Sequence, residues 1–291
     1  MSDFIQVMIA PFVACMVLVA MFAYLGIHII AREVIFVDLS LAQMAALGST
    51  GALLFGVAPH SGLGHLFALG ATMLGAFIFA MTRTSRARRR VPQEAIIGIV
   101  FVVASAAAIL VADRAPRGAE LIKDVLVGSI LWVDWTAVLR LAVVFGLVGF
   151  FHWLLRRRFL TISLDEDAAE RNGWNTKWWD FLFYASFGIA ITVAVPVAGV
   201  LLVFTFLVVP AVIAFLFTRR TALLLAISWS AAALASAAGL AVSFQFDLPT
   251  GPLIICLFGL VLLGAGFTCR WFPPPSQYRE TVGSSGRGAG T

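Results

Sequence analysis

The sequence predicts an all-α membrane protein, a bundle of eight or nine transmembrane helices. Apolar residues make up 61% of the 291 positions, charged residues make up 12%, and the mean hydropathy is +1.00. A soluble domain carries roughly a quarter charged residues. Several apolar stretches reach the roughly 20 residues that cross a bilayer. Because lipid offers no partner to open backbone groups, and no polar alternation marks these stretches, we expect helices rather than a β-barrel.

Nine segments are the candidate spans. They lie near residues 5–30, 36–56, 64–82, 93–112, 136–155, 179–198, 200–217, 221–243 and 252–269. The pair between Phe181 and Phe217 can also be divided differently, which leaves eight spans open. The stretch from Val125 to Val133 is too short to cross and is a candidate half-helix. Pro196 and Pro210 lie inside apolar stretches, where proline kinks or breaks a helix.

The basic residues predict which way the spans run, because Lys and Arg gather in cytoplasmic loops. One side of the predicted bundle collects Arg32, Arg83, Arg86, Arg88, Arg89, Arg90, Arg156 to Arg158, Arg171, Lys177, Arg219, Arg220 and Arg270. The other side receives Arg114, Arg117 and Lys123, offset by Asp113, Glu120 and Asp124. Nine spans with the N-terminus outside and the C-terminus in the cytoplasm fit this distribution.

Two regions follow from composition. Residues 1–272 form the predicted transmembrane domain, and residues 273–291 are rich in Pro, Ser, Gly and Arg. We expect this tail to be a disordered cytoplasmic segment. Cys15, Cys256 and Cys269 stand singly in apolar surroundings, so we expect buried thiols rather than a disulfide framework or a zinc site.

The longest polar stretch is a predicted cytoplasmic loop at about residues 160–178. Ser163 and Asp165 are candidate caps of a short helix there, and Gly173 is its candidate end. The pattern leaves two interpretations open, a solvated connection between spans and a helix that docks on a cytoplasmic partner.

Polar residues at membrane depth are candidates for a transport pathway. Asp38, Ser40 and Gln43 follow one another at the start of the second span, although Asp38 is also explained as an interfacial charge beside Arg32. Glu94 stands at the start of a span, where a helix N-terminus stabilises an anion. His60 and His65 share a predicted external loop, where a lone surface histidine is the simpler interpretation than a metal contact.

Taken together, six segments resemble the ABC-3 family of metal-importer permeases, and the resemblance covers most of residues 8–270. The segments are Arg32 to Phe36, Glu94 to Ile99, Leu126 to Leu131, Asp165 to Gly173, Gly199 to Ala211, and Asp247 to Gly251. The resemblance implies a type II ABC importer-like permease in the inner (plasma) membrane. It would move a divalent transition metal, zinc or manganese ahead of iron, by alternating access.

The same resemblance implies the partners and several residue roles. Two copies would form the pore, cytoplasmic ABC ATPases would sit below it, and an external metal-binding protein would deliver the cargo. The coupling helix on the ATPase would hold Asp165, Glu166, Ala169 and Gly173, and Gly128 and Asp247 would belong to an external gate or docking region. Lys123 and Lys177 are not in a GxxxxGK[ST] loop, so this chain is not expected to be an enzyme or to bind a cofactor, and ATP belongs to the partner subunit.

One departure leaves the cargo open. The family's second span usually reads Asp-x-x-x-His, and the aligned positions here are Leu39 and Gln43. Asp38 is one residue away, which turns it about 100° around a helix. A neutral amide is a poor ligand for zinc, so Asp38 and Gln43 are at best weak metal ligands. The alternatives are the same importer with a non-metal cargo, and an ion-coupled secondary transporter.

Overall fold

A computed structural model describes residues 2–59, 61–83, 91–114, 118–164 and 166–271, and within these ranges it contains helices and no strands. Eight of the described helices are long and apolar enough to cross a membrane. They are α1 (Ser2–Ala31), α2 (Val37–Gly51, extended by the 3-10 turn η1, Ala52–Phe55), α3 (Gly62–Thr82), α4 (Gln93–Ala112), α6 (Trp135–Leu154), α9 (Thr176–Phe217), α10 (Thr221–Phe246) and α11 (Thr250–Trp271). The predicted all-α transmembrane bundle is confirmed.

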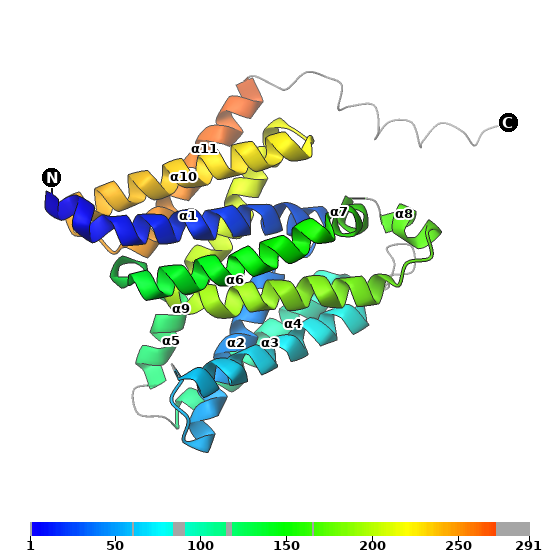
Figure 1. Cartoon of the computed structure of the whole chain (residues 1–291), viewed down its shortest axis with the longest axis horizontal. Coiled ribbons are helices and arrows are strands. Elements are labelled where there is room, and N and C mark those ends of the chain that lie inside the picture. Colours follow the sequence, from blue (N-terminus) through cyan, green and yellow to red (C-terminus); the bar gives the residue numbers. More distant parts are fainter. Residues whose placement is uncertain (1, 60, 84–90, 115–117, 165, 272–291) are drawn as a thin grey trace.

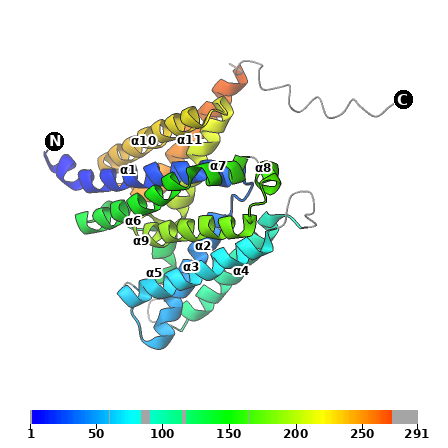
Figure 2. The same cartoon turned by 45° about the vertical axis from the view of Figure 1, so that its right-hand side comes forward.

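The centre of the bundle is α9. It packs against α1, α2, α3, α6, α10 and α11, so most of the molecule is assembled around it (Figure 1, Figure 2). Its aromatic side chains Phe183, Tyr184, Phe187 and Phe206 are fully buried. By contrast α4 and α11 leave most of their apolar surface uncovered, as expected for helices that face lipid.

A single residue divides α9 into two segments. A straight helix of 42 residues would be about 63 Å long, roughly twice the hydrocarbon core of a bilayer. Gly199 interrupts it with φ 76° and ψ 158°, a conformation that is essentially restricted to glycine. Figure 1 shows the first half beside α6 and the second half turning toward α10 and α11. The break falls at the expected boundary between two spans, so eight helices contain all nine predicted segments. Pro210 lies within the helix without breaking it.

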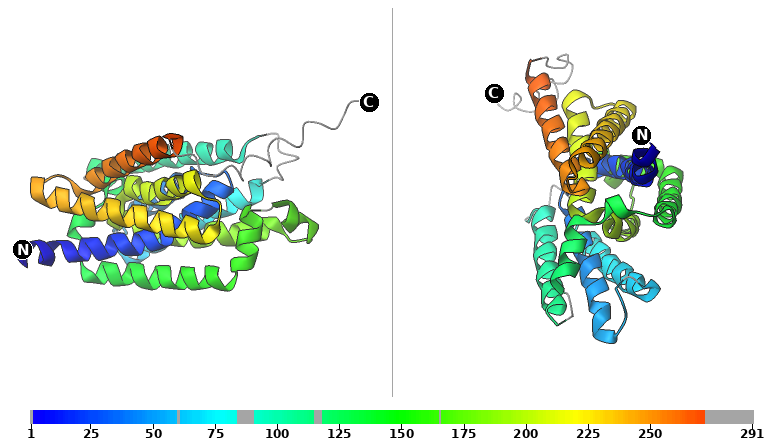
Figure 3. Two further views of the ribbon diagram at one scale, coloured as in Figure 1. Left: turned by 90° about the horizontal axis from the view of Figure 1, so that it is seen from above. Right: turned by 90° about the vertical axis from the view of Figure 1, so that its left-hand side faces the viewer.

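Two ends of the bundle can be distinguished. The short helices α7 (Arg156–Leu164) and α8 (Glu166–Arg171) lie at the end opposite to the start of α1 (Figure 3). The exposed cations Arg156, Arg157, Arg158, Arg171 and Lys177 belong to this α7–α8 end. The predicted partition of charge thus has its counterpart in the fold, and which end faces the cytoplasm stays a prediction. Arg86 to Arg90, Arg117 and the predicted tail lie outside the described residues.

Three expectations need correction. Arg32 and Arg83 are buried rather than exposed loop charges. Arg140 in α6, which the charge partition omitted, is an exposed cation toward the end opposite to α7. Of the three thiols only Cys15 is buried, because Cys256 and Cys269 lie on the outward-facing helix α11.

Candidate transport pathway and coupling site

The predicted cytoplasmic loop folds into two short helices with a defined end. The N–H of Trp174 donates to the carbonyl of Ala169 at 3.2 Å, which is the 6→1 hydrogen bond of a Schellman motif. Gly173 supplies the left-handed residue with φ 68°, and Ala169 is fully buried beneath the turn. The predicted helix end at Gly173 is confirmed. Asp165 lies outside the described residues, and Glu166 is placed by its backbone as the first residue of α8.

Ser163 does not cap a helix as expected. It lies in the last turn of α7, and its Oγ accepts from Nε of Arg32 at 2.8 Å and lies 2.8 Å from Nδ1 of His28. Both partners are in or just after the last turn of α1. This buried contact therefore fastens α7, the segment directly before α8, to α1.

A buried ion-pair cluster continues from Arg32. Its Nη1 donates to Oδ1 of Asp180 at 2.6 Å, and Nη1 of Arg83 donates to the same oxygen at 2.8 Å. Asp180 lies in α9 and is fully buried, Arg83 follows α3, and the guanidinium of Arg32 lies 4.0 Å from the ring centroid of Phe183. Because two guanidinium groups share one carboxylate away from water, removal of that carboxylate would take from both of them the counter-charge they contact here.

The residues His28, Ser163, Arg32, Asp180 and Arg83 form a continuous buried chain, here called the coupling network. It joins α7 to α1, α9 and the end of α3, three of the helices that make up the bundle. Sequence reasoning missed it, because each residue alone is a span-end charge, a lone histidine or, for Ser163, a candidate helix cap. A usable signal was the acid Asp180 near the start of the predicted span 179–198, on the same side of the predicted bundle as Arg32 and Arg83.

The candidate pathway residues of α2 do not form one site. Asp38 is 0% exposed, and neither carboxylate oxygen has a hydrogen-bond partner among the described residues. Ser40 is buried in the same unpartnered state, while Gln43 is half-buried. Five residues turn a helix by about 140°, so Asp38 and Gln43 point in different directions. The fold thus does not bring these two side chains together, and no group of three His, Cys, Asp or Glu residues that could hold a metal occurs in the described ranges.

Leu39 and Gln43 instead share one face of α2, one helical turn apart and half-buried. Exposed Phe36 precedes them by one turn. In a single chain this face of α2 is incompletely covered, although α3, α4 and α9 pack around the rest of the helix.

Glu94 has a structural role that the sequence only partly indicated. It begins α4, but its carboxylate accepts the backbone N–H of Ile35, and the N–H of Phe36 also reaches it. These groups precede α2, where no side chain of α2 itself provides a cap. Glu94 therefore anchors the start of α2 to α4, which fixes the helix that carries Asp38 and Gln43.

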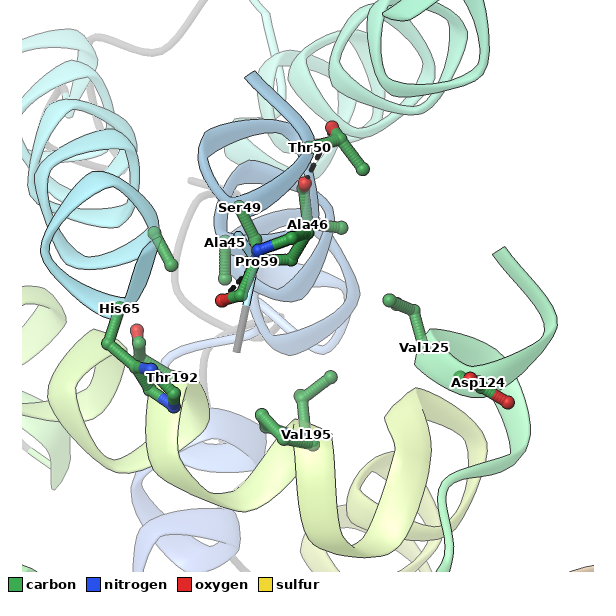
Figure 4. Close-up of a pocket in the computed structure, with 12 residues that line it drawn as sticks. Ala45, Ala46, Ser49, Thr50, Pro59, His65, Asp124, Val125, Thr192 and Val195 are labelled. Carbon is green, nitrogen blue, oxygen red and sulfur yellow. Dashed lines mark hydrogen bonds between the residues drawn. The ribbon is translucent and has the colours of Figure 1, made fainter. Parts of the chain in front are cut away.

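A cavity of about 80 Å³ lies among α2, α3, α5 (Gly118–Val127) and the first half of α9 (Figure 4). Its lining includes Ser49, Thr50, His65, Asp124 and Thr192. His65 belongs to α3 rather than to a loop, and its Nδ1 lies 2.8 Å from the carbonyl of Ser61. In Figure 4 the imidazole of His65 lies close to Thr192, whereas Asp124 sits on the far side of the cavity. His60 lies outside the described residues.

Three of the sequence motifs converge at the break of α9. Gly128, with φ 67°, follows α5, and a Cβ built on it would lie 2.2 Å from the backbone nitrogen of Gly199. Ser129 N–H donates to the carbonyl of Val197 at 3.1 Å. The predicted half-helix is thus the end of α5 followed by a 3-10 turn, η3 (Ile130–Trp132), seated on that break.

Asp247 shapes the turn that brings the third motif to this place. It caps the end of α10 in the left-handed conformation, with φ 51°. The turn leads into α11, where a Cβ on Gly251 would lie 3.3 Å from the carbonyl of Val127. Asp247 is exposed and Gly128 is packed against backbone, so this end of the bundle is held by close backbone contact around the Gly199 break.

Comparison with known proteins agrees with this architecture. Over 212 residues the chain is 29% identical to the chelated iron transport system membrane protein YfeC of Yersinia pestis, covering 73% of this chain and 72% of the relative. It is 26% identical over 204 residues to the manganese transport system membrane protein MntB of Synechocystis, covering 68% and 66%. The fold matches PsaBC from Streptococcus pneumoniae in complex with Fab, with a TM-score of 0.76, 20% identity, and coverage of 97% and 99%.

A broken central helix, outward-facing apolar helices and a pair of short helices at one end define a multi-pass α-helical transmembrane protein. The chain belongs to the ABC 3 transport family, which it matches over residues 4–268. The fold also matches an inward-facing conformation of an ABC transporter, with a TM-score of 0.66, 20% identity, and coverage of 89% of this chain and 85% of that chain.

Proposed function

We propose that this chain is the permease subunit of an importer for a divalent transition metal, manganese or iron, with zinc as a further candidate. Two copies form the pathway in the inner membrane, a separate ATPase supplies the energy, and an external binding protein delivers the cargo. The observation that carries the proposal is family membership over nearly the whole chain, together with relatives named for manganese and iron transport. That membership counts against an ion-coupled secondary transporter.

The coupling network supports the role of α7 and α8 as the contact with the ATPase. Leu164 ends α7 and is 55% exposed at the end of the bundle, an apolar side chain available to a protein partner. Movement of α7 would be passed to α1, α9 and the end of α3, because Ser163, Arg32 and Asp180 connect them directly. A displacement of α7 by the ATPase subunit would thus move helices that pack around α2.

Replacing Leu164 by glutamate tests this contact. Burying a leucine at an interface contributes about 1.5–3 kcal/mol, so the change should weaken the complex with the ATPase about tenfold or more. We expect less ATPase to co-purify and ATP-dependent uptake in reconstituted vesicles to fall in parallel. Leu248, which is 44% exposed in the turn after α10 at the opposite end of the bundle, provides the control, since Leu248→Glu should leave the amount of co-purified ATPase unchanged.

Deletion of residues 165–173 gives the stronger form of the same test. It should abolish ATP-dependent uptake while the purified permease remains a monodisperse membrane protein. Intact uptake after this deletion, or unchanged ATPase binding by the Leu164→Glu variant, would refute the assigned role of α7 and α8.

A second candidate function is the same importer with a non-metal cargo, favoured by the separation of Asp38 and Gln43 and by the absence of a three-ligand group in the described ranges. The half-buried position of Gln43 on the incompletely covered face of α2 supports a place for it in the pathway between two copies.

Substitutions at Gln43 separate the two cargoes. Imidazole is a strong ligand for divalent transition metals and an amide is not. For a metal cargo, Gln43→His should tighten the apparent affinity for manganese or zinc and slow release, while Gln43→Ala should alter flux little. Uptake of each metal into vesicles that contain the ATPase measures both. If neither substitution changes the metal flux, Gln43 does not contact a metal. If the parent protein transports none of the metals tested, the second candidate function is favoured.

A further inference from the structure

A long apolar groove runs along α1 between α6 and α10. Both helices pack against α1, which lies between them in Figure 1 and in the end view of Figure 3. The groove has a volume of about 570 Å³. Met21 of α1, Ala142 and Phe145 of α6, and Leu225 of α10 are among its lining residues. Its shape and lining suit a flexible hydrocarbon chain.

Two glycines on α6 keep the groove open. A Cβ built on Gly146 or on Gly149 would meet no atom within 4 Å. Glycine at these positions is therefore not required by contact within the chain, although glycine in a helix interior is less stable than alanine. Bare backbone at both positions leaves space along α6 that another molecule can fill.

One end of the groove is strongly basic. Trp153 and Arg156 line the groove and also an adjoining pocket of about 410 Å³, whose remaining lining residues are Leu154, Leu155, Arg157 and Arg158. The guanidinium of Arg156 lies 5.5 Å from the ring centroid of Trp153. Arg156, Arg157 and Arg158 are exposed, and within the described part of the chain none of them forms an ion pair. The apolar groove thus ends at a group of exposed arginines, whose charge favours an anion.

The dimensions match one half of a bilayer. The groove follows α6 from Ala142 to Trp153, eleven residues or about 16 Å of helix. One leaflet supplies about 15 Å of hydrocarbon, half of the roughly 30 Å core. Trp153 and Arg156 stand where α6 ends and α7 begins, which is the level expected for lipid headgroups.

We propose that this groove is a binding site for an anionic phospholipid, with an acyl chain along Gly146 and Gly149 and the phosphate on Arg156 and Arg157. Basic residues at helix ends favour anionic headgroups about fivefold for each Lys or Arg. Charge complementarity selects a lipid over a second copy of this chain, which would bring the same unpaired arginines to the contact. The site is separate from the coupling network and does not depend on the cargo.

Lipid retention by the purified full chain tests the proposal. Native mass spectrometry would count bound phosphatidylglycerol and phosphatidylcholine after both are offered at equal concentration. We expect phosphatidylglycerol to be retained about 30-fold more, because two arginines contribute. The variant R156Q/R157Q should lose this preference, and G146L/G149L should lose retention of both lipids because leucine fills the groove. The matched control is Gly259→Leu on α11, where a Cβ also meets no atom within 4 Å and which lies outside the groove.

Two results would overturn the assignment. Equal retention of the two lipids, or an unchanged preference in R156Q/R157Q, would show that the arginines do not hold the headgroup. These side chains are exposed, so this variant should fold even if the leucine variant does not. If G146L/G149L converts a dimer to a monomer without changing lipid retention, the groove is an interface between copies.

Discussion

Replacing Asp180 by asparagine should destabilise the folded protein by about 3–5 kcal/mol, because two buried guanidinium groups would lose their shared counter-charge. The side chain keeps its size, so the loss is electrostatic rather than a packing defect. We expect a much lower unfolding temperature in detergent and a smaller monodisperse fraction. Any protein that folds should show weakened ATP-dependent transport, since the coupling network would be cut at its centre.

The matched control is Asp134→Asn, the same chemical change at an exposed position. Asp134 caps α6 by accepting the N–H of Ala137 at 2.8 Å, and asparagine is an equally good cap. This variant should unfold like the parent. Arg83→Gln should be milder than Asp180→Asn, because Arg32 still pairs with the carboxylate. An unfolding temperature of Asp180→Asn equal to that of the parent would contradict the ion-pair cluster.

Replacing Gly199 by alanine should also prevent normal folding. The position has φ 76° and ψ 158°, and occupying such a conformation costs a residue with a side chain about 1–3 kcal/mol. In addition the new Cβ would lie 2.4 Å from the carbonyl carbon of Val127 and 2.5 Å from the nitrogen of Gly128. Because both neighbours are backbone atoms, relief requires α5 to move away from α9. Low yield of monodisperse protein and loss of transport are the expected results.

Gly98→Ala serves as the control for this substitution. Gly98 lies inside α4, where a Cβ would meet no atom within 4 Å, so alanine should leave stability unchanged or raise it by about 0.5–1 kcal/mol. Thermal unfolding of the two variants in the same detergent makes the comparison direct. A Gly199→Ala protein that unfolds at the parent temperature would show that the break in α9 is not needed for the fold.

Much of the candidate site could be named from sequence, but its internal geometry could not. The motifs around Gly128, Gly199 and Gly251 were recognisable one by one, whereas their meeting at a single point depends on how α5, α9 and α11 pack. Glu94 was identified as a helix-start anion, yet the backbone groups it binds lie 59 and 58 residues earlier, before α2. Asp38 and Gln43 were grouped by proximity in sequence, and helical rotation separates them.

The sequence by itself determined the membrane class, eight or nine apolar segments and the end of the short helix at Gly173. Each of these follows from local physics, namely the transfer of apolar residues to lipid and the restriction of certain backbone angles to glycine. Only the tertiary structure decided that Arg32 and Arg83 are buried and share Asp180, and that Ser163 binds α1 instead of capping a helix. It also decided that an apolar groove with arginines at one end lies beside α1. These features join residues more than 90 positions apart, and such pairings are set by packing rather than by any local pattern.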